Sequence, residues 1–166
     1  MDRLIESFLN PGVMRISAPY LVRGVWMTVR LCVVVIPLGI AAGLVLATLH
    51  SLRHRWLNVL LIVYVDLFRA LPPLVLLVFV YYGLPHMGVV LSPFLAVVLA
   101  FMLNTSSYYG EILRAGIESV PRGQWEAARS TGLGRVQTMR HVVLPQAVRS
   151  VLPDLVSNTL EVVKLT

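Results

Sequence analysis

An uninterrupted apolar run is the feature that most restricts what this chain folds into. Residues Leu31 to Leu49 are nineteen consecutive positions without an acidic or basic side chain. At about 1.5 Å per residue, a helix of that length crosses a hydrocarbon core of about 30 Å. Inside lipid every backbone N–H and C=O needs an internal partner, so the run predicts a transmembrane α-helix. Gly39 and Gly43 within the run form a G-x-x-x-G pair, which would allow close contact with another helix.

Two more apolar blocks and a fourth, mixed block follow this run. The chain is 57% hydrophobic and only 13% charged, which is too little polar surface for an ordinary soluble domain. We therefore expect an all-α integral membrane protein, a single transmembrane domain over residues 1–166 with about four spans. Its expected parts are an N-terminal arm at 1–22, membrane helices at 24–49, 57–84, 92–115 and about 145–164, and a polar loop at 117–144.

The distribution of charge predicts how the chain sits in the membrane. The formal net charge of +6 is compatible with a nucleic-acid partner, but the apolar spans leave no soluble core, so we expect no nucleic acid. The break at 50–56 carries two arginines, the region 110–149 carries six against three glutamates, and 83–93 has no acid, lysine or arginine. The positive-inside rule then predicts cytoplasmic first and third breaks and an N-terminus outside.

A charged pair lies inside the second apolar block. Asp66 and Arg69 stand three residues apart, shortly before Pro72-Pro73. A charge inside a span is costly unless it is paired or faces protein. Two interpretations stay open, a site near a translocation path or a structural ion pair near a broken helix. The double proline predicts an interrupted helix, after which the apolar run 74–82 completes the crossing.

Uncharged polar side chains also interrupt the third and fourth blocks. A hydroxyl or amide inside a span needs a hydrogen-bond partner, which a neighbouring helix or a polar cavity supplies. The fourth block has so many polar groups that we expect other protein to shield it, with Ser157, Asn158 and Glu161 turned inward. Contact with a transported substrate and hydrogen bonding between helices both stay open for Asn104, Ser107, Tyr108, Ser157, Asn158 and Glu161.

The polar stretch from Gln124 to Pro145 differs from everything around it. It is basic and carries two glycines, Gly132 and Gly134, which predict two short helices separated by a turn. The second helix is expected to end at Pro145, which lacks a backbone N–H. Helical spacing gives each helix one face of apolar or small residues. Two interpretations of these faces stay open: the helices dock into a groove of a partner protein, or they lie on the membrane surface. The faces are Trp125, Ala128 and Gly132 on the first helix and Val136, Met139 and Val143 on the second.

A family resemblance rests on this stretch. Glu126-Ala127-Ala128, Gly132 after three more residues, and Leu144-Pro145 resemble the EAA loop of ABC-importer membrane subunits, with Val142 where isoleucine is usual. The flanking sequence is similar to the branch that imports polar amino acids, namely the histidine, glutamine, glutamate, arginine and opine permeases. That similarity extends over roughly residues 20–166 and includes Gly24, Thr28, Phe68–Pro72, Gly83–Pro85, Glu111–Ile117, Gly123–Gln124 and Gln146–Ala147.

The resemblance implies a permease subunit that forms the translocation path of an ATP-driven importer in a bacterial inner membrane. Its coupling helix would dock on an ABC ATPase that binds ATP and magnesium, while this chain binds no cofactor or metal and has no catalytic residue. The implied partners are a second membrane subunit, identical or different, an extracytoplasmic solute-binding protein and an amino acid, beside the lipid bilayer. The implied coupling residues are Glu126, paired with a basic group of the ATPase, Ala127 and Ala128 at the close approach, Gly132 at the bend, and Leu144 and Pro145.

The resemblance also bears on the C-terminal end of the chain. Relatives continue beyond a sequence like Lys164-Leu165-Thr166 into another apolar span, so the resemblance implies a subunit truncated before its last span.

An energy-independent channel or an ion-coupled secondary carrier is the alternative function, because it too accounts for broken helices and charges inside the membrane. A membrane-anchored structural protein is a third class. Neither explains the fixed spacing of the loop motif.

Overall fold

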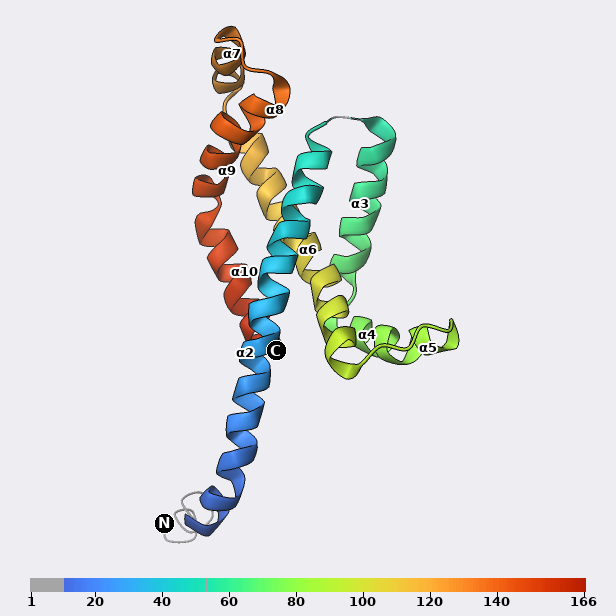
Figure 1. Ribbon diagram of the computed structural model, residues 1–166. Helices are drawn as coiled ribbons and strands as arrows, with labels where there is room; N and C mark the ends of the chain where they lie inside the picture. The colour runs from blue at the N-terminus through green and yellow to red at the C-terminus, as the bar shows by residue number, and fades with distance from the viewer. Residues whose placement is uncertain (1–10, 53) are drawn as a thin grey trace.

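The computed structural model describes residues 11–52 and 54–166, and every regular element in these two segments is a helix. The elements are α2 (Pro11–His50), α3 (Arg55–Ala70), α4 (Pro73–Val78), the π-helix η1 (Phe79–Gly83), α5 (Leu84–His86), α6 (Pro93–Ser119), α7 (Arg122–Ser130), α8 (Arg135–Thr138), the π-helix η2 (Met139–Val143), α9 (Leu144–Ser150) and α10 (Leu152–Leu165). In Figure 1 the helices α2, α3, α6 and α10 form a bundle, with α7 and α8 at one end and α4 and α5 toward the other. The all-α prediction is confirmed.

The longest helix is also the most apolar. Its segment Gly12–His50 is long and apolar enough to cross a membrane, and the pair α3 and Pro73–His86 passes the same test only when both halves are taken together. Helix α6 has 27 residues, but its second half holds the buried polar run Asn104 to Ser107, which lowers its hydropathy. It packs along α2 and α3, so the protein itself covers much of that run.

Helix α2 begins earlier than expected. It starts at Pro11 and continues past Pro19 and Gly24, so residues 11–22 belong to the helix rather than to a separate arm. Proline suits a helix start, because its fixed φ is helical and the first N–H has no partner within the helix. Residues 1–10 of the expected arm lie outside the described residues.

Two glycines of α2 allow it to approach α6 closely. A Cβ at Gly43 would lie 2.7 Å from Gly110 N and 2.7 Å from Tyr109 Cβ, and one at Gly39 would meet Thr105 Oγ1. Small residues four apart are a common device for close packing of membrane helices. The spacing predicts this contact, and the structure confirms it.

Gly43→Val is therefore expected to destabilise the bundle by about 1–3 kcal/mol or more, because overpacking forces the backbones apart. Gly24→Val is the matched control, since no heavy atom lies within 4 Å of a Cβ built at Gly24. Thermal unfolding in detergent, followed by size-exclusion chromatography, measures the difference. Equal melting temperatures for the two variants would contradict this account of the α2–α6 contact.

The second predicted span breaks at the double proline and then changes direction. Helix α3 ends at Ala70, which confirms the predicted interruption, and the segment Pro73–His86 runs at 101° to it. The two parts are long and apolar enough for a crossing only when they are taken as one bent span, so completion of the crossing by residues 74–82 stays a prediction. Asn104 of α6 holds the broken end, because its Nδ2 donates to Phe68 O at 2.9 Å and to Leu71 O at 3.4 Å. A side chain that satisfies freed carbonyls makes a break inside the membrane tolerable.

Candidate functional site

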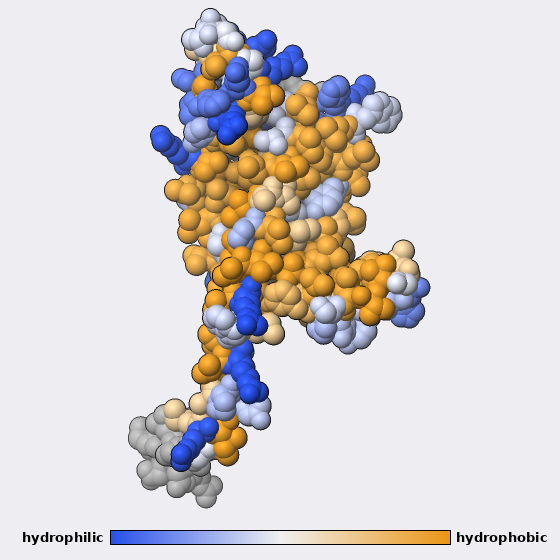
Figure 2. Space-filling model, viewed as in Figure 1, coloured by the Kyte–Doolittle hydropathy of each residue, from blue (hydrophilic) through white to orange (hydrophobic). Residues whose placement is uncertain are grey.

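The polar loop forms a small helical unit at the end of the bundle. Figure 1 shows α7 and α8 beyond the ends of α2 and α3, and Figure 2 shows that this end is hydrophilic whereas the bundle surface is hydrophobic. A turn at Thr131–Gly134 separates α7 from α8. Gly132 has φ of +87°, a conformation that non-glycine side chains rarely adopt, so the predicted bend at this residue is confirmed.

The second helix of the loop does not end at Pro145. The chain passes from α8 through η2 into α9, and Pro145 lies in the first turn of α9. In a regular α-helix the proline ring would clash with a carbonyl of the preceding turn, and the wider π-turn directly before it relieves that clash. Gln146 Nε2 donates to Val142 O at 2.8 Å and so gives a carbonyl beside the break a partner. The expected stop is therefore wrong, and the loop is joined to α9 by continuous helix.

One face of α7 packs inward and the opposite face points outward. Trp125 packs against the hydrophobic core below it, and Ala128 is buried. Glu126 and Ala127 are exposed. Within the motif, Ala128 thus holds α7 in place, while Glu126 and Ala127 form an outward pair that is accessible to a partner. Of the remaining motif residues, Leu144 is half-buried and Pro145 is exposed.

The second predicted apolar face is only partly correct. Val143 is fully buried and Met139 packs against the same core, but Val136 is 79% exposed. Thr138 takes the inward position instead, with an exposed fraction of 0%. The π-turn at Met139–Val143 changes the angular step along the helix, so a constant helical period places Val136 on the wrong side.

The charges around the outward pair are almost all positive. Glu126 is the only acidic residue between Ser119 and Pro153, among five arginines. Arg122, Arg129, Arg135 and Arg140 are all exposed on the loop. Within the described residues Glu126 makes no ion pair, so its carboxylate is available to a cation supplied from outside this chain.

The loop is tightly connected to the membrane helices. A core cluster joins Leu113 and Ile117 of α6 to Val143 of η2 and Ala147 of α9. Helices α6 and α9 approach so closely at Gly116 that a Cβ added to this glycine would lie 2.9 Å from Ala147 O. A close-packed contact of this kind transmits displacement, because packed interiors are hardly compressible. The helices α6 and α9 and the π-helix η2 therefore form one closely packed unit.

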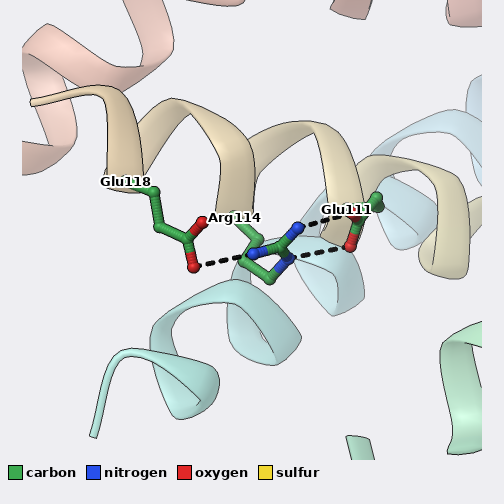
Figure 3. A network of polar contacts seen from close by, with 3 residues as sticks. All are labelled: Glu111, Arg114 and Glu118. Carbon is green, nitrogen blue, oxygen red and sulfur yellow. Dashed lines mark hydrogen bonds and ion pairs between the residues drawn. The ribbon is translucent and has the colours of Figure 1, made fainter. Parts of the chain in front are cut away.

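An ion-pair ladder runs along the part of α6 nearest the polar loop. Arg114 lies between Glu111 and Glu118 (Figure 3), with Nη2 2.6 Å from Glu111 Oε1, Nε 2.9 Å from Glu111 Oε2 and Nη1 2.7 Å from Glu118 Oε1. All three residues belong to the same helix at spacings of three and four. A guanidinium bound by two carboxylates holds its neighbours in a defined geometry.

The polar residues predicted on the third span mostly bond within the protein. Asn104 binds the broken end of α3, and Ser107 Oγ donates to Asn104 O at 2.6 Å within α6. Tyr108 carries the guanidinium of Arg69 over its ring, at 5.2 Å from the centroid. Hydrogen bonding between helices is thus the role that the geometry gives Asn104, and Ser107 satisfies its own helix.

On the fourth block, two of the three residues predicted to turn inward are exposed within this chain. Ser157 and Glu161 are exposed, and Glu161 pairs only with Lys164 at 3.3 Å on the same helix. Asn158 is half-buried, and its Nδ2 is buried without a hydrogen bond. Within the described residues neither Ser157 nor Glu161 faces another helix, so shielding of this face by other protein stays a prediction. The inward face of α10 consists of Leu155, Thr159 and Val162 instead.

One polar contact was missed by the sequence analysis. Tyr109 is fully buried, and its hydroxyl lies 2.8 Å from Thr159 Oγ1, which joins α6 to α10. Thr159 lies four residues after Leu155 and three before Val162, and this helical spacing is the signal that places it on the packed face. Within the described residues, no group of three or more His, Cys, Asp or Glu side chains has a geometry fit for a metal ion.

The chain belongs to the family of binding-protein-dependent transport system inner membrane components, which matches it over residues 36–166. It is therefore a membrane-embedded transport subunit, and its role is transport rather than catalysis. Membership also agrees with the position of the loop, which is anchored to the bundle through Ala128 and carries its exposed motif residues on the outside.

Amino-acid permeases are among the proteins similar to this chain. Probable amino-acid ABC transporter permease protein YckA of Bacillus subtilis (strain 168) is 36% identical over 159 residues, which is 96% of this chain and 70% of YckA. The L-cystine transport system permease protein TcyB of the same organism is 37% identical over 148 residues, 89% of this chain and 63% of TcyB. A solved amino acid ABC transporter with histidines has a chain of 34% identity and TM-score 0.79, covering 92% of this chain and 71% of that one. The resemblance to polar amino acid permeases and the fold class are confirmed.

Proposed function

We propose that this chain is the membrane-spanning permease subunit of an ATP-driven importer of polar amino acids in a bacterial inner membrane. The observation that carries the proposal is the construction of the loop. Its outward Glu126 and Ala127 are exposed, and a continuous helix and a close-packed core connect them to α6 and α9. Similarity to amino-acid ABC permeases supports the substrate class.

Coupling follows from this geometry. An ABC ATPase, which holds ATP and magnesium, receives α7 and pairs a basic group with Glu126. When the ATPase dimer closes on nucleotide, it displaces α7, and the displacement reaches α6 and α9 through the contact at Gly116. The membrane subunits then change from inward-facing to outward-facing. The remaining partners are a second membrane subunit, identical or different, and an extracytoplasmic solute-binding protein.

The orientation is part of the same proposal. The loop and the break between α2 and α3 face the cytoplasm, and the N-terminus lies outside. Two observations support it: arginines concentrate in these two breaks, and in Figure 1 both breaks lie at the same end of the bundle, opposite α4 and α5. The exposed polar face of α10, with Ser157 and Glu161 and with Asn158 beside it, lines the path between the two membrane subunits.

Uptake in cells tests the proposal against the two alternatives. Deleting the candidate ABC ATPase is expected to abolish accumulation of the amino acid, because ATP hydrolysis by that separate subunit drives the import. An energy-independent channel would still equilibrate the substrate, and an ion-coupled carrier would still concentrate it until an ionophore collapsed the gradient. Either of those outcomes would contradict ATP-driven import. An ATPase variant that binds but does not hydrolyse ATP is the matched control.

A further inference from the structure

A cavity of about 300 Å³ lies between α2, α3 and α6. Five of its eleven lining residues are ionisable, namely His50, Asp66, Arg69, Glu111 and Arg114. The others are apolar or glycine and come from all three helices. Ligand sites in proteins have volumes from about this size upward and combine an apolar wall with a few polar groups.

Two of the charged groups in this cavity are already satisfied. Both carboxylate oxygens of Glu111 accept from Arg114, whose third nitrogen donates to Glu118 (Figure 3). The ladder therefore forms one fixed side of the cavity. It leaves Asp66 and Arg69 on α3 as the groups with unused charge.

Asp66 and Arg69 make no ion pair with each other, although they stand one helical turn apart. Within residues 11–52 and 54–166, neither side chain makes a hydrogen bond or an ion pair of any kind. The Arg69 guanidinium is instead held over the ring of Tyr108, which fixes its position and leaves its N–H donors free. The structural ion pair considered from the sequence is thus absent from the part of the chain that the structure describes.

The balance of charge indicates what fits there. Two carboxylates and two guanidiniums line the cavity, so its formal charge is zero when His50 is neutral. A simple anion or cation would leave one of the free groups unpaired, and an unpaired charge inside a span is costly. A zwitterion pairs with both groups at once.

We propose that this cavity binds the charged backbone of a free α-amino acid, with Arg69 holding the α-carboxylate and Asp66 the α-ammonium. This proposal rests on the proposed function and adds two substrate-binding residues to it. These two residues recognise only the backbone of the amino acid, so selection between side chains occurs at another site. Both residues are exposed in this chain, so they are accessible to a ligand.

Binding of defined probes to the assembled importer in lipid nanodiscs tests the proposal. The probes are L-histidine and L-glutamine, histamine and 4-aminobutanamide, which lack the α-carboxylate, and imidazolepropionate and glutaramate, which lack the α-ammonium. Unaltered protein is expected to prefer the complete amino acid to either truncated form by about tenfold to a hundredfold, as for a lost charged hydrogen bond. Arg69→Gln is expected to remove the preference over the decarboxylated probe only, and Asp66→Asn the preference over the deaminated probe only.

Controls separate this proposal from the function on which it rests. Arg55→Gln, at the start of the same helix and outside the cavity, is expected to keep both preferences, and Arg69→Lys is expected to keep part of the first. Unchanged preferences in both Arg69→Gln and Asp66→Asn, or no saturable binding by a protein that imports either amino acid, would overturn the cavity assignment alone. Failure of the unaltered complex to import any amino acid with ATP would instead overturn the proposed function.

Discussion

Gly132→Val is expected to uncouple ATP hydrolysis from import, with roughly tenfold less amino acid imported per ATP, because a strained left-handed residue costs about 1–3 kcal/mol. Gly132 has φ of +87°, and no heavy atom lies within 4 Å of a Cβ built there. The substitution therefore strains the turn without disturbing any packing contact. Relaxation of that strain moves α7 relative to η2, and with it the surface offered to the ATPase.

Two neighbouring variants make this result specific. Gly132→Asn is expected to retain most of the coupling, since asparagine tolerates the left-handed region far better than a β-branched residue. Gly134→Val is expected to behave like the unaltered chain, because Gly134 has an extended conformation with φ of −67° and ψ of 167°. Uptake and phosphate release measured together in proteoliposomes give the ratio. A normal ratio for Gly132→Val would rule out backbone conformation as the role of Gly132.

Glu126→Lys is expected to weaken binding of the ATPase by about thirtyfold or more, as when a buried interfacial charge pair is broken. Glu126 is exposed and has no ion-pair partner among the described residues, while the arginines around it already repel a cationic group. Reversing its charge removes the one anion on this surface. The loop itself is expected to stay folded, because Trp125 and Ala128 hold α7 in place from the opposite face.

Affinity measured with immobilised permease and soluble ATPase quantifies this loss. Asp154→Lys, at the exposed first turn of α10, changes the net charge by the same amount far from α7 in sequence and is expected to leave the affinity unchanged. An equal effect of both variants would indicate general electrostatics, and no effect of Glu126→Lys would exclude Glu126 from the interface. Weaker binding at higher salt is a further expectation for a charged contact.

Sequence patterns predicted the parts of the fold that depend on local chemistry. Glycines four residues apart at Gly39 and Gly43 predicted a close helix contact, and Pro72-Pro73 predicted a break, because both effects arise within a few residues of their cause. The turn at Gly132 belongs to the same group. In each case a glycine or a proline determines the local backbone geometry, and packing against the rest of the protein does not change it.

Features that depend on distant parts of the molecule were predicted less well. The direction taken after Pro73 depends on how α4 and η1 pack against α6, which no local pattern records. The predictions for Pro145 and Val136 assumed a constant helical period. They were wrong because the π-turn η2 changes the angular step along the helix. Shielding of Ser157 and Glu161 stays a prediction, because both residues are exposed within this chain and a polar side chain in a membrane helix need not face its own chain. A face toward a partner subunit satisfies the same physical requirement.

Co-purification of the permease with its candidate ABC ATPase in detergent tests whether α7 binds the ATPase. A Glu126→Lys, Gly132→Asp double variant is purified in parallel, and its folding is checked by thermal unfolding. The unaltered permease is expected to retain the ATPase, and the double variant is expected to lose it while remaining folded. Equal retention by both would place the interface away from α7. No retention by the well-folded unaltered permease would contradict coupling to an ATPase and favour an ion-coupled carrier.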